Sequence, residues 1–149
     1  MAVDVWYDAE EDDPTTVATP AELDAILDVM VGWGDPVLAD VRISNATGPL
    51  WRVSLSVGVS GRTGRGTLIH TAPGEVAYGK ASPGPEWSPA DRVLYYLMNS
   101  DTEFPPDAEL PLADVKDAAH HFLTTGGGRL TPTDWHWHTP PPNLPLTAQ

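Results

Sequence analysis

Four segments with the character of β-strands follow one another along the middle of the chain, separated only by short turns. They are Pro36–Ile43, Leu50–Val59, Thr67–Ala72 and Glu75–Lys80. Parallel neighbours need crossover connections of a dozen or more residues, whereas antiparallel neighbours can be joined by a tight turn. The short connections therefore favour a mostly antiparallel sheet, and this constrains the fold more than any other feature of the sequence.

The segment Leu50–Val59 has the clearest alternation of apolar and polar residues. Its two faces would carry Trp51, Val53, Leu55 and Val57 on one side and Arg52, Ser54 and Ser56 on the other. Strict alternation is typical of a strand with one buried and one solvated face. We therefore expect a half-buried strand here, preceded by a turn at Asn45–Pro49.

Two helices are indicated by capping signals and apolar stripes. Thr19 is placed to be an N-cap, with Pro20 at the first helical position and Glu22 as the capping-box acid. The apolar stripe Leu23, Ile26, Leu27 and Met30 follows, and Gly32 or Gly34 would end this helix. The second helix is expected from about Leu112 to Thr124, with a stripe of Leu112, Val115, Ala118 or Ala119, Phe122 and Leu123. The glycines of Thr125–Gly128 would cap it.

The remaining segments complete the expected order of elements. Val3–Tyr7 predicts a short strand, Asp8–Pro14 an acidic loop and Asp101–Pro111 an acidic connection broken by prolines. Asp91–Asn99 is apolar on both faces, which favours a central strand, with a helix as the alternative. The last strand would be Thr133–Trp137. This order predicts an α+β fold, in which a mostly antiparallel sheet of about six to seven strands has two helices packed on one face. Residues 1–138 would form one domain, and 139–149 a flexible proline-rich tail.

The charge of the chain is strongly asymmetric. The net charge is −13, and the first 40 residues hold no lysine or arginine. Those 40 residues contain the acids Asp4, Asp8, Glu10, Glu11, Asp12, Asp13, Glu22, Asp24, Asp28, Asp35 and Asp40. Such a field repels phosphate backbones and anionic membranes, and it attracts basic proteins. We therefore expect no direct binding of nucleic acid or membrane; the sequence does not indicate an oligomeric state.

Motifs for catalysis or cofactor binding do not emerge from the sequence. The chain has no cysteine, which excludes disulfides, thiolate metal sites and cysteine nucleophiles. The glycine-rich stretches lack the spacing of a phosphate-binding loop, so no cofactor is expected. His136 and His138 would share one face of the last strand and could bind zinc if a third ligand joined them. The simpler interpretation is that Trp135 and Trp137 anchor this strand in the core and the histidines form its polar face.

One aromatic residue, Trp87, has a sequence context that is typical of a protein interface. Trp87 lies between prolines in a loop, and tryptophan is among the residue types that most often anchor protein interfaces. The other tryptophans fall mostly in expected strands, so we expect them in the core. The N-terminus has no basic and apolar pattern of a signal peptide, which favours a cytoplasmic protein.

The second half of the chain resembles the Imm1 family of bacterial immunity proteins. The resemblance covers about Val76 to His138, from "VAYG" and "LYYL" through to the final tryptophan strand. The matching features are Phe104-Pro105, Ala118-Ala119, Phe122, Thr125-Gly126 and Trp135 or Trp137. An additional glycine, Gly127 or Gly128, and a second Trp-His unit depart from the family pattern. These motifs describe the scaffold and transfer no interface residue.

The resemblance implies a binding protein and not an enzyme. Imm1-like proteins are encoded beside polymorphic toxins, often nucleic-acid deaminases, and neutralise them by binding. A toxin of that class would present a basic active-site groove, to which an acidic protein is attracted. The candidate contacts are Glu10, Glu11, Asp12, Asp13, Trp87, Asp101 and Glu103. Two alternatives remain open: a metal-binding domain or enzyme that uses His136 and His138, and an acidic DNA-mimic adaptor.

Overall fold

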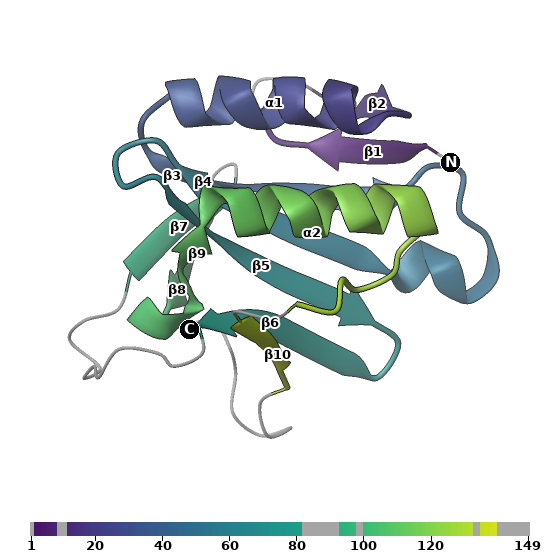
Figure 1. The fold of residues 1–149 in the computed structure, drawn as a ribbon. Coiled ribbons are helices and arrows are strands. Elements are labelled where there is room, and N and C mark those ends of the chain that lie inside the picture. The colour runs from purple at the N-terminus through teal and green to yellow at the C-terminus, as the bar shows by residue number, and fades with distance from the viewer. Residues whose placement is uncertain (1, 9–11, 82–92, 98–99, 133–134, 140–149) are drawn as a thin grey trace.

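The computed structural model describes residues 2–8, 12–81, 93–97, 100–132 and 135–139. The chain order is β1 (Val3–Trp6), β2 (Thr15–Val17), α1 (Pro20–Gly32), β3 (Pro36–Ile43), the 3-10 helix η1 (Gly48–Arg52), β4 (Ser54–Ser60), β5 (Arg65–Ala72), β6 (Glu75–Ala81), β7 (Val93–Leu97), β8 (Ser100–Phe104), the 3-10 turn η3 (Pro106–Ala108), β9 (Leu110–Pro111), α2 (Leu112–Thr125) and β10 (Trp135–His138). Figure 1 shows the sheet with both helices lying on one face. The expected α+β class is confirmed.

The sheet is antiparallel along its main path, in the order β10-β6-β5-β4-β3-β1-β2. Gly64 and Gly74 provide the positive φ angles of 69° and 74° in the turns that join β4 to β5 and β5 to β6. The exception to antiparallel pairing is the contact of β3 with β7, where Val37 and Tyr96 form a parallel pair. Short connections therefore decide the topology, as the sequence predicts.

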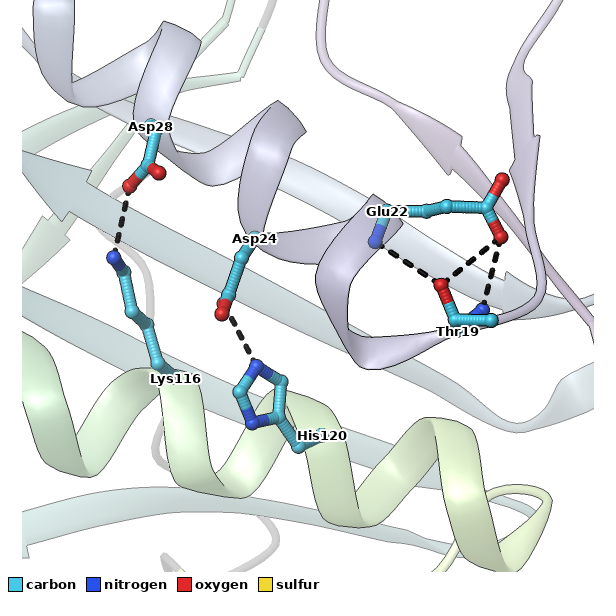
Figure 2. A network of polar contacts seen from close by, with 6 residues as sticks. All are labelled: Thr19, Glu22, Asp24, Asp28, Lys116 and His120. Atoms are coloured by element: carbon cyan, nitrogen blue, oxygen red, sulfur yellow. Dashed lines mark hydrogen bonds and ion pairs between the residues drawn. The ribbon is translucent and has the colours of Figure 1, made fainter.

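Helix α1 begins with the expected capping box. The Thr19 hydroxyl accepts the Glu22 N–H at 3.2 Å, and the Glu22 carboxylate accepts the Thr19 N–H at 3.1 Å (Figure 2). The pKa of Glu22 is lowered, first by the hydrogen bond from the Ala18 backbone and then by Thr19, because both favour the charged carboxylate. The apolar stripe of α1 is buried against the sheet, as expected, at Leu23, Ile26, Leu27 and Met30.

Helix α2 lies beside α1 and buries the predicted stripe from Val115 to Leu123, with both Ala118 and Ala119 inside it, while Leu112 is partly buried. Its end is fixed by Gly126, which has φ 72° and donates its N–H to the Phe122 carbonyl. The two helices and the sheet enclose the main core, which includes Phe122 and Leu27 at 0% exposure. The glycine cap expected at Thr125–Gly128 is confirmed.

The sheet face opposite the helices is covered where a solvated face was expected. Leu38, Tyr78, Tyr95, Phe104 and Ala108 form a second, smaller core there. Tyr95 packs on β4 so closely that a Cβ placed on Gly58 would lie 2.9 Å from its ring. The expectation of one wet face on β4 is therefore wrong, because the hairpin of β7 and β8 together with η3 covers part of it. Ser54 and Ser60 are also buried.

Two segments differ from the sequence prediction because of their surroundings. Gly48–Arg52 is a 3-10 helix and not the start of a strand, and the pairing of β3 with β4 ends at Arg42 and Ser54. The acidic connection expected at Asp101–Pro111 contains strand β8, which pairs with β7 along its whole length. The strand expected at Asp91–Asn99 is confirmed over Val93–Leu97, although it lies off the main path of the sheet and exposes Leu94 and Tyr96.

Candidate interaction surface

The closing strand β10 places its two tryptophans and two histidines on opposite faces. Trp135 is 4% exposed, and the Trp137 indole N–H donates to the Leu130 carbonyl at 2.9 Å. His136 is exposed, and the His138 ring makes an edge contact with Tyr78. This is the arrangement in which the tryptophans anchor the strand and the histidines form its polar face.

The surroundings of these histidines do not build a metal site in the described part of the chain. Strand pairing sets His136 opposite Lys80, whose ammonium lies 2.9 Å from the Asp107 carboxylate. Partial burial lowers the pKa of His138, and the nearby charge of Lys80 lowers it further. Within the described residues, no group of three histidine, aspartate or glutamate side chains could hold a metal ion.

A second pair of histidines, His120 and His121, lies on α2, where His120 contacts α1. Its Nε2 lies 2.7 Å from the Asp24 carboxylate, and the Lys116 ammonium donates to Asp28 at 2.8 Å (Figure 2). The hydrogen bond to Asp28 raises the pKa of Lys116 by favouring its charged form. Two acids of α1 are thus held by two side chains of α2, one turn apart.

Acidic candidates from the N-terminal segment lie at one end of the sheet. Asp12 and Asp13 are exposed and precede β2, and Val5 of β1 pairs with Thr15 of β2. The hairpin register therefore puts Asp12 and Asp13 near the end of β1, where Tyr7 follows. Glu10, Glu11 and Trp87 lie outside the described residues.

The candidate contact residues of β8, Asp101 and Glu103, lie towards the same end of the molecule. In the ladder of β7 and β8, Asp101 pairs with Tyr96, and Glu103 with Leu94. Tyr96 in turn pairs with Val37 near the start of β3. Neighbouring strands lie about 4.8 Å apart, so the backbone of Asp101 is roughly 10 Å from that of Val37. Figure 1 shows β7 and β8 beyond the end of the sheet where α1 finishes.

Two exposed tryptophans were missed by the sequence prediction, which expected them in the core. Trp33 is 45% exposed and stacks on Tyr7, with ring centroids 6.0 Å apart and planes inclined by 20°. Trp51 is 56% exposed, and the Arg52 guanidinium lies 5.0 Å from the centre of its ring. For Trp33 the sequence carried no signal of exposure, since it lies three residues after Met30 and seven after Ile26, on the spacing of the apolar stripe of α1.

A shallow apolar groove accompanies Trp51 at the opposite end of the sheet. Its volume is about 320 Å³, and it is lined by Gly48, Pro49, Trp51, Arg52 and Pro73. Among the described residues, exposed tryptophans therefore mark two surfaces of the protein. One lies at the end of α1 beside the acidic segment, and the other lies on η1 beside an arginine.

Comparison with known proteins bears on the function of these surfaces. The family model of immunity protein Imm1 matches residues 11–139. A search of curated proteins finds no match. In the part of the chain that the structure describes, no helix is both long enough and apolar enough to cross a membrane.

Proposed function

We propose, because this chain belongs to the Imm1 family of immunity proteins, that it neutralises a nucleic-acid deaminase toxin by binding over the toxin's substrate groove. The family is non-enzymatic, so the function of the chain resides in its surface and not in a catalytic centre. Family membership supports a cognate toxin as the partner. The class of toxin and the way in which it is blocked go beyond family membership and are what we propose.

The distribution of charge is the observation that supports this class of toxin and this way of blocking it. A deaminase that acts on a polynucleotide must bind its phosphates with a cationic groove and admit one base to a pocket. The chain carries a net charge of −13, and its first 40 residues have no basic side chain. Its field would steer it to such a groove and raise the association rate. An acidic protein seated there would exclude the nucleic acid.

The contacts that we propose come from the N-terminal segment and from β8. Asp12 and Asp13 are exposed, and strand β8, which contains Asp101 and Glu103, lies towards the same end of the molecule. Glu10, Glu11 and Trp87 belong to the same proposal on sequence grounds alone. We also propose that the protein acts in the cytoplasm as one domain over residues 1–138, with 139–149 as a tail.

The alternative functions receive less support from the described residues. A metal-dependent activity through His136 and His138 needs a third ligand, and the described neighbours of this pair include the cation Lys80. A DNA-mimic adaptor would share the charge but would not need the Imm1 scaffold. Metal analysis of the purified protein tests the first alternative, and an unbiased pull-down tests the second.

Co-expression with the toxin encoded beside the gene tests the proposal directly. We expect the two proteins to co-purify and growth to be restored. Persisting toxicity without co-purification would refute the proposed function. The association rate should fall as salt rises from about 0.05 to 0.5 M, because the Debye length shortens from roughly 14 to 4 Å. A rate independent of salt would remove the electrostatic argument for a cationic groove.

A further inference from the structure

The exposed end of α1 carries an apolar surface that its own fold leaves uncovered. Val29 and Trp33 are four residues apart, so their side chains are neighbours on one side of the helix. They are 49% and 45% exposed. We call Tyr7, Val29 and Trp33 the Trp33 surface. It lies on the side of α1 that faces away from α2, because Asp24 and Asp28 occupy the side that contacts α2.

The Trp33 side chain is held in place before any partner arrives. Trp33 has helical backbone angles at the end of α1, and its N–H donates to Met30. Its ring stacks on Tyr7, which packs against the main core. An aromatic group that is already ordered loses little conformational entropy on binding, which is a property of residues that dominate interface energetics.

The charges around this surface are acidic. Asp28 precedes Val29 but lies on the side of α1 that contacts α2, whereas Asp35 lies two residues after Trp33 and its side chain is 66% exposed. Asp12 and Asp13 approach from the hairpin between β1 and β2. The cations described nearby, Lys116 and Arg62, are each bonded to an aspartate, at 2.8 and 3.3 Å. Each of these ion pairs is neutral overall, so the negative charge that borders the apolar centre comes from Asp12 and Asp13.

The second exposed tryptophan has the opposite electrostatic character. The Arg52 guanidinium lies over the ring of Trp51, so it occupies part of the aromatic face and adds positive charge. A cationic groove is repelled there and attracted to the Trp33 surface. Charge therefore distinguishes two aromatic surfaces of similar exposure. It also disfavours a second copy of this chain as the occupant, because symmetric pairing would bring the Asp12 and Asp13 carboxylates of two copies together.

We infer that the Trp33 surface is the anchor by which this protein binds its toxin, and that it inserts into an apolar recess bordered by lysines and arginines on the toxin. This inference rests on the proposed function and states which surface of the protein contacts the toxin. The binding mode is an aromatic anchor surrounded by acid–base pairs, in which Trp33 supplies most of the affinity and the aspartates supply orientation and rate.

Three variants test this assignment against the toxin domain that co-purifies with the wild-type protein, by calorimetry or by surface binding kinetics. Trp33→Ala removes the anchor. Val29→Lys adds positive charge to the surface at an exposed helical position, which the fold tolerates. Trp51→Ala is the matched control, because it removes a tryptophan of comparable exposure from the opposite end of the sheet. Circular dichroism and urea denaturation establish that each variant is folded.

We expect Trp33→Ala to weaken binding by about 30-fold or more, the range of a dominant interface residue, mainly through faster dissociation. Val29→Lys should weaken binding at least tenfold and slow association. Trp51→Ala should bind with an affinity within about twofold of wild type.

Binding that is unchanged in Trp33→Ala and Val29→Lys overturns the inference while the proposed function stands. A loss of binding confined to Trp51→Ala does the same. Failure of the wild-type protein to bind any toxin removes the proposed function, and the inference with it. A wild-type dimer that Trp33→Ala dissociates, with toxin affinity unaltered, assigns the surface to self-association and overturns the inference.

Discussion

The contact between Gly61 and the end of α1 provides a sharp test of the structure. Gly61 begins the turn between β4 and β5, and a Cβ built on it overlaps the carbonyl oxygen of Val31 and lies 3.3 Å from Gly34 Cα. The same Val31 carbonyl accepts the Gly34 N–H, and the Arg62 N–H donates to the Gly34 carbonyl at 3.2 Å. Gly61→Ala therefore forces the turn away from the helix end by roughly a carbon–carbon bond length, about 1.5 Å.

The magnitude follows from what that displacement breaks. Overpacking a tight contact costs about 1–3 kcal/mol, and loss of the Arg62 hydrogen bond adds about 1 kcal/mol. We expect the free energy of unfolding to fall by about 2–4 kcal/mol in urea titrations. For a chain of this size the corresponding drop in Tm is roughly 5–15 °C. Because Trp33 lies between Val31 and Gly34, its stacking on Tyr7 should also be disturbed, which near-ultraviolet circular dichroism detects.

Gly32→Ala is the matched control for this prediction. Gly32 is the last residue of α1, and a Cβ there meets nothing within 4 Å. The same chemical change should leave stability unaltered or raise it by about 0.5 kcal/mol, because alanine favours the helix. If Gly61→Ala proves as stable as Gly32→Ala, the turn does not pack against α1 as described, and the argument that the fold holds Trp33 in place fails with it.

Two further predictions concern buried polar groups. Thr67 is 0% exposed, and its hydroxyl oxygen has no hydrogen-bond partner among the described residues. Thr67→Val should therefore raise the free energy of unfolding by about 1 kcal/mol in urea titrations, and a decrease would show that the hydroxyl is bonded. Burial lowers the pKa of His70 despite the hydrogen bond of its Nε2 to the Gly127 carbonyl, so the folded protein keeps this ring neutral where the unfolded chain binds a proton. Stability should therefore fall as pH drops below about 6.5, by at most about 1.4 kcal/mol per pH unit, until the folded-state pKa is reached. His70→Gln should flatten this slope between pH 5 and 7, and an unchanged slope would assign it to other groups.

The elements that could be predicted from sequence are those whose local signals agree with their tertiary role. The Thr19 capping box, the apolar stripes of both helices and the short turns around Gly64 and Gly74 each act within a few residues. Their effects do not depend on distant parts of the chain. The α+β class followed from them, because short turns fix antiparallel pairing and apolar stripes fix where helices pack.

The elements that could not be predicted depend on distant partners. Strand β8 is polar and ends at a Phe-Pro pair, and it forms because β7 offers a complete ladder. The segment around Trp51 alternates like a strand, but its ladder with β3 begins only at Ser54, and Gly48–Arg52 forms a 3-10 helix instead. Of the candidate site, the acidic character of the N-terminal segment was visible in the sequence. The exposure of Trp33 was not, because it depends on how α1 ends over Tyr7.

The two cores on opposite faces of the sheet divide the molecule into two parts of different local stability. The larger core under the helices binds β3, β4 and β5 into one body, whereas β7 joins that body through a single described ladder pair, Val37 with Tyr96. The smaller core contains five buried residues, so the hairpin of β7 and β8 can open by a sub-global step that leaves the helical face intact. Its amide protons should exchange with solvent well before those of the central strands, and the acids on β8 then belong to the most adaptable part of the protein.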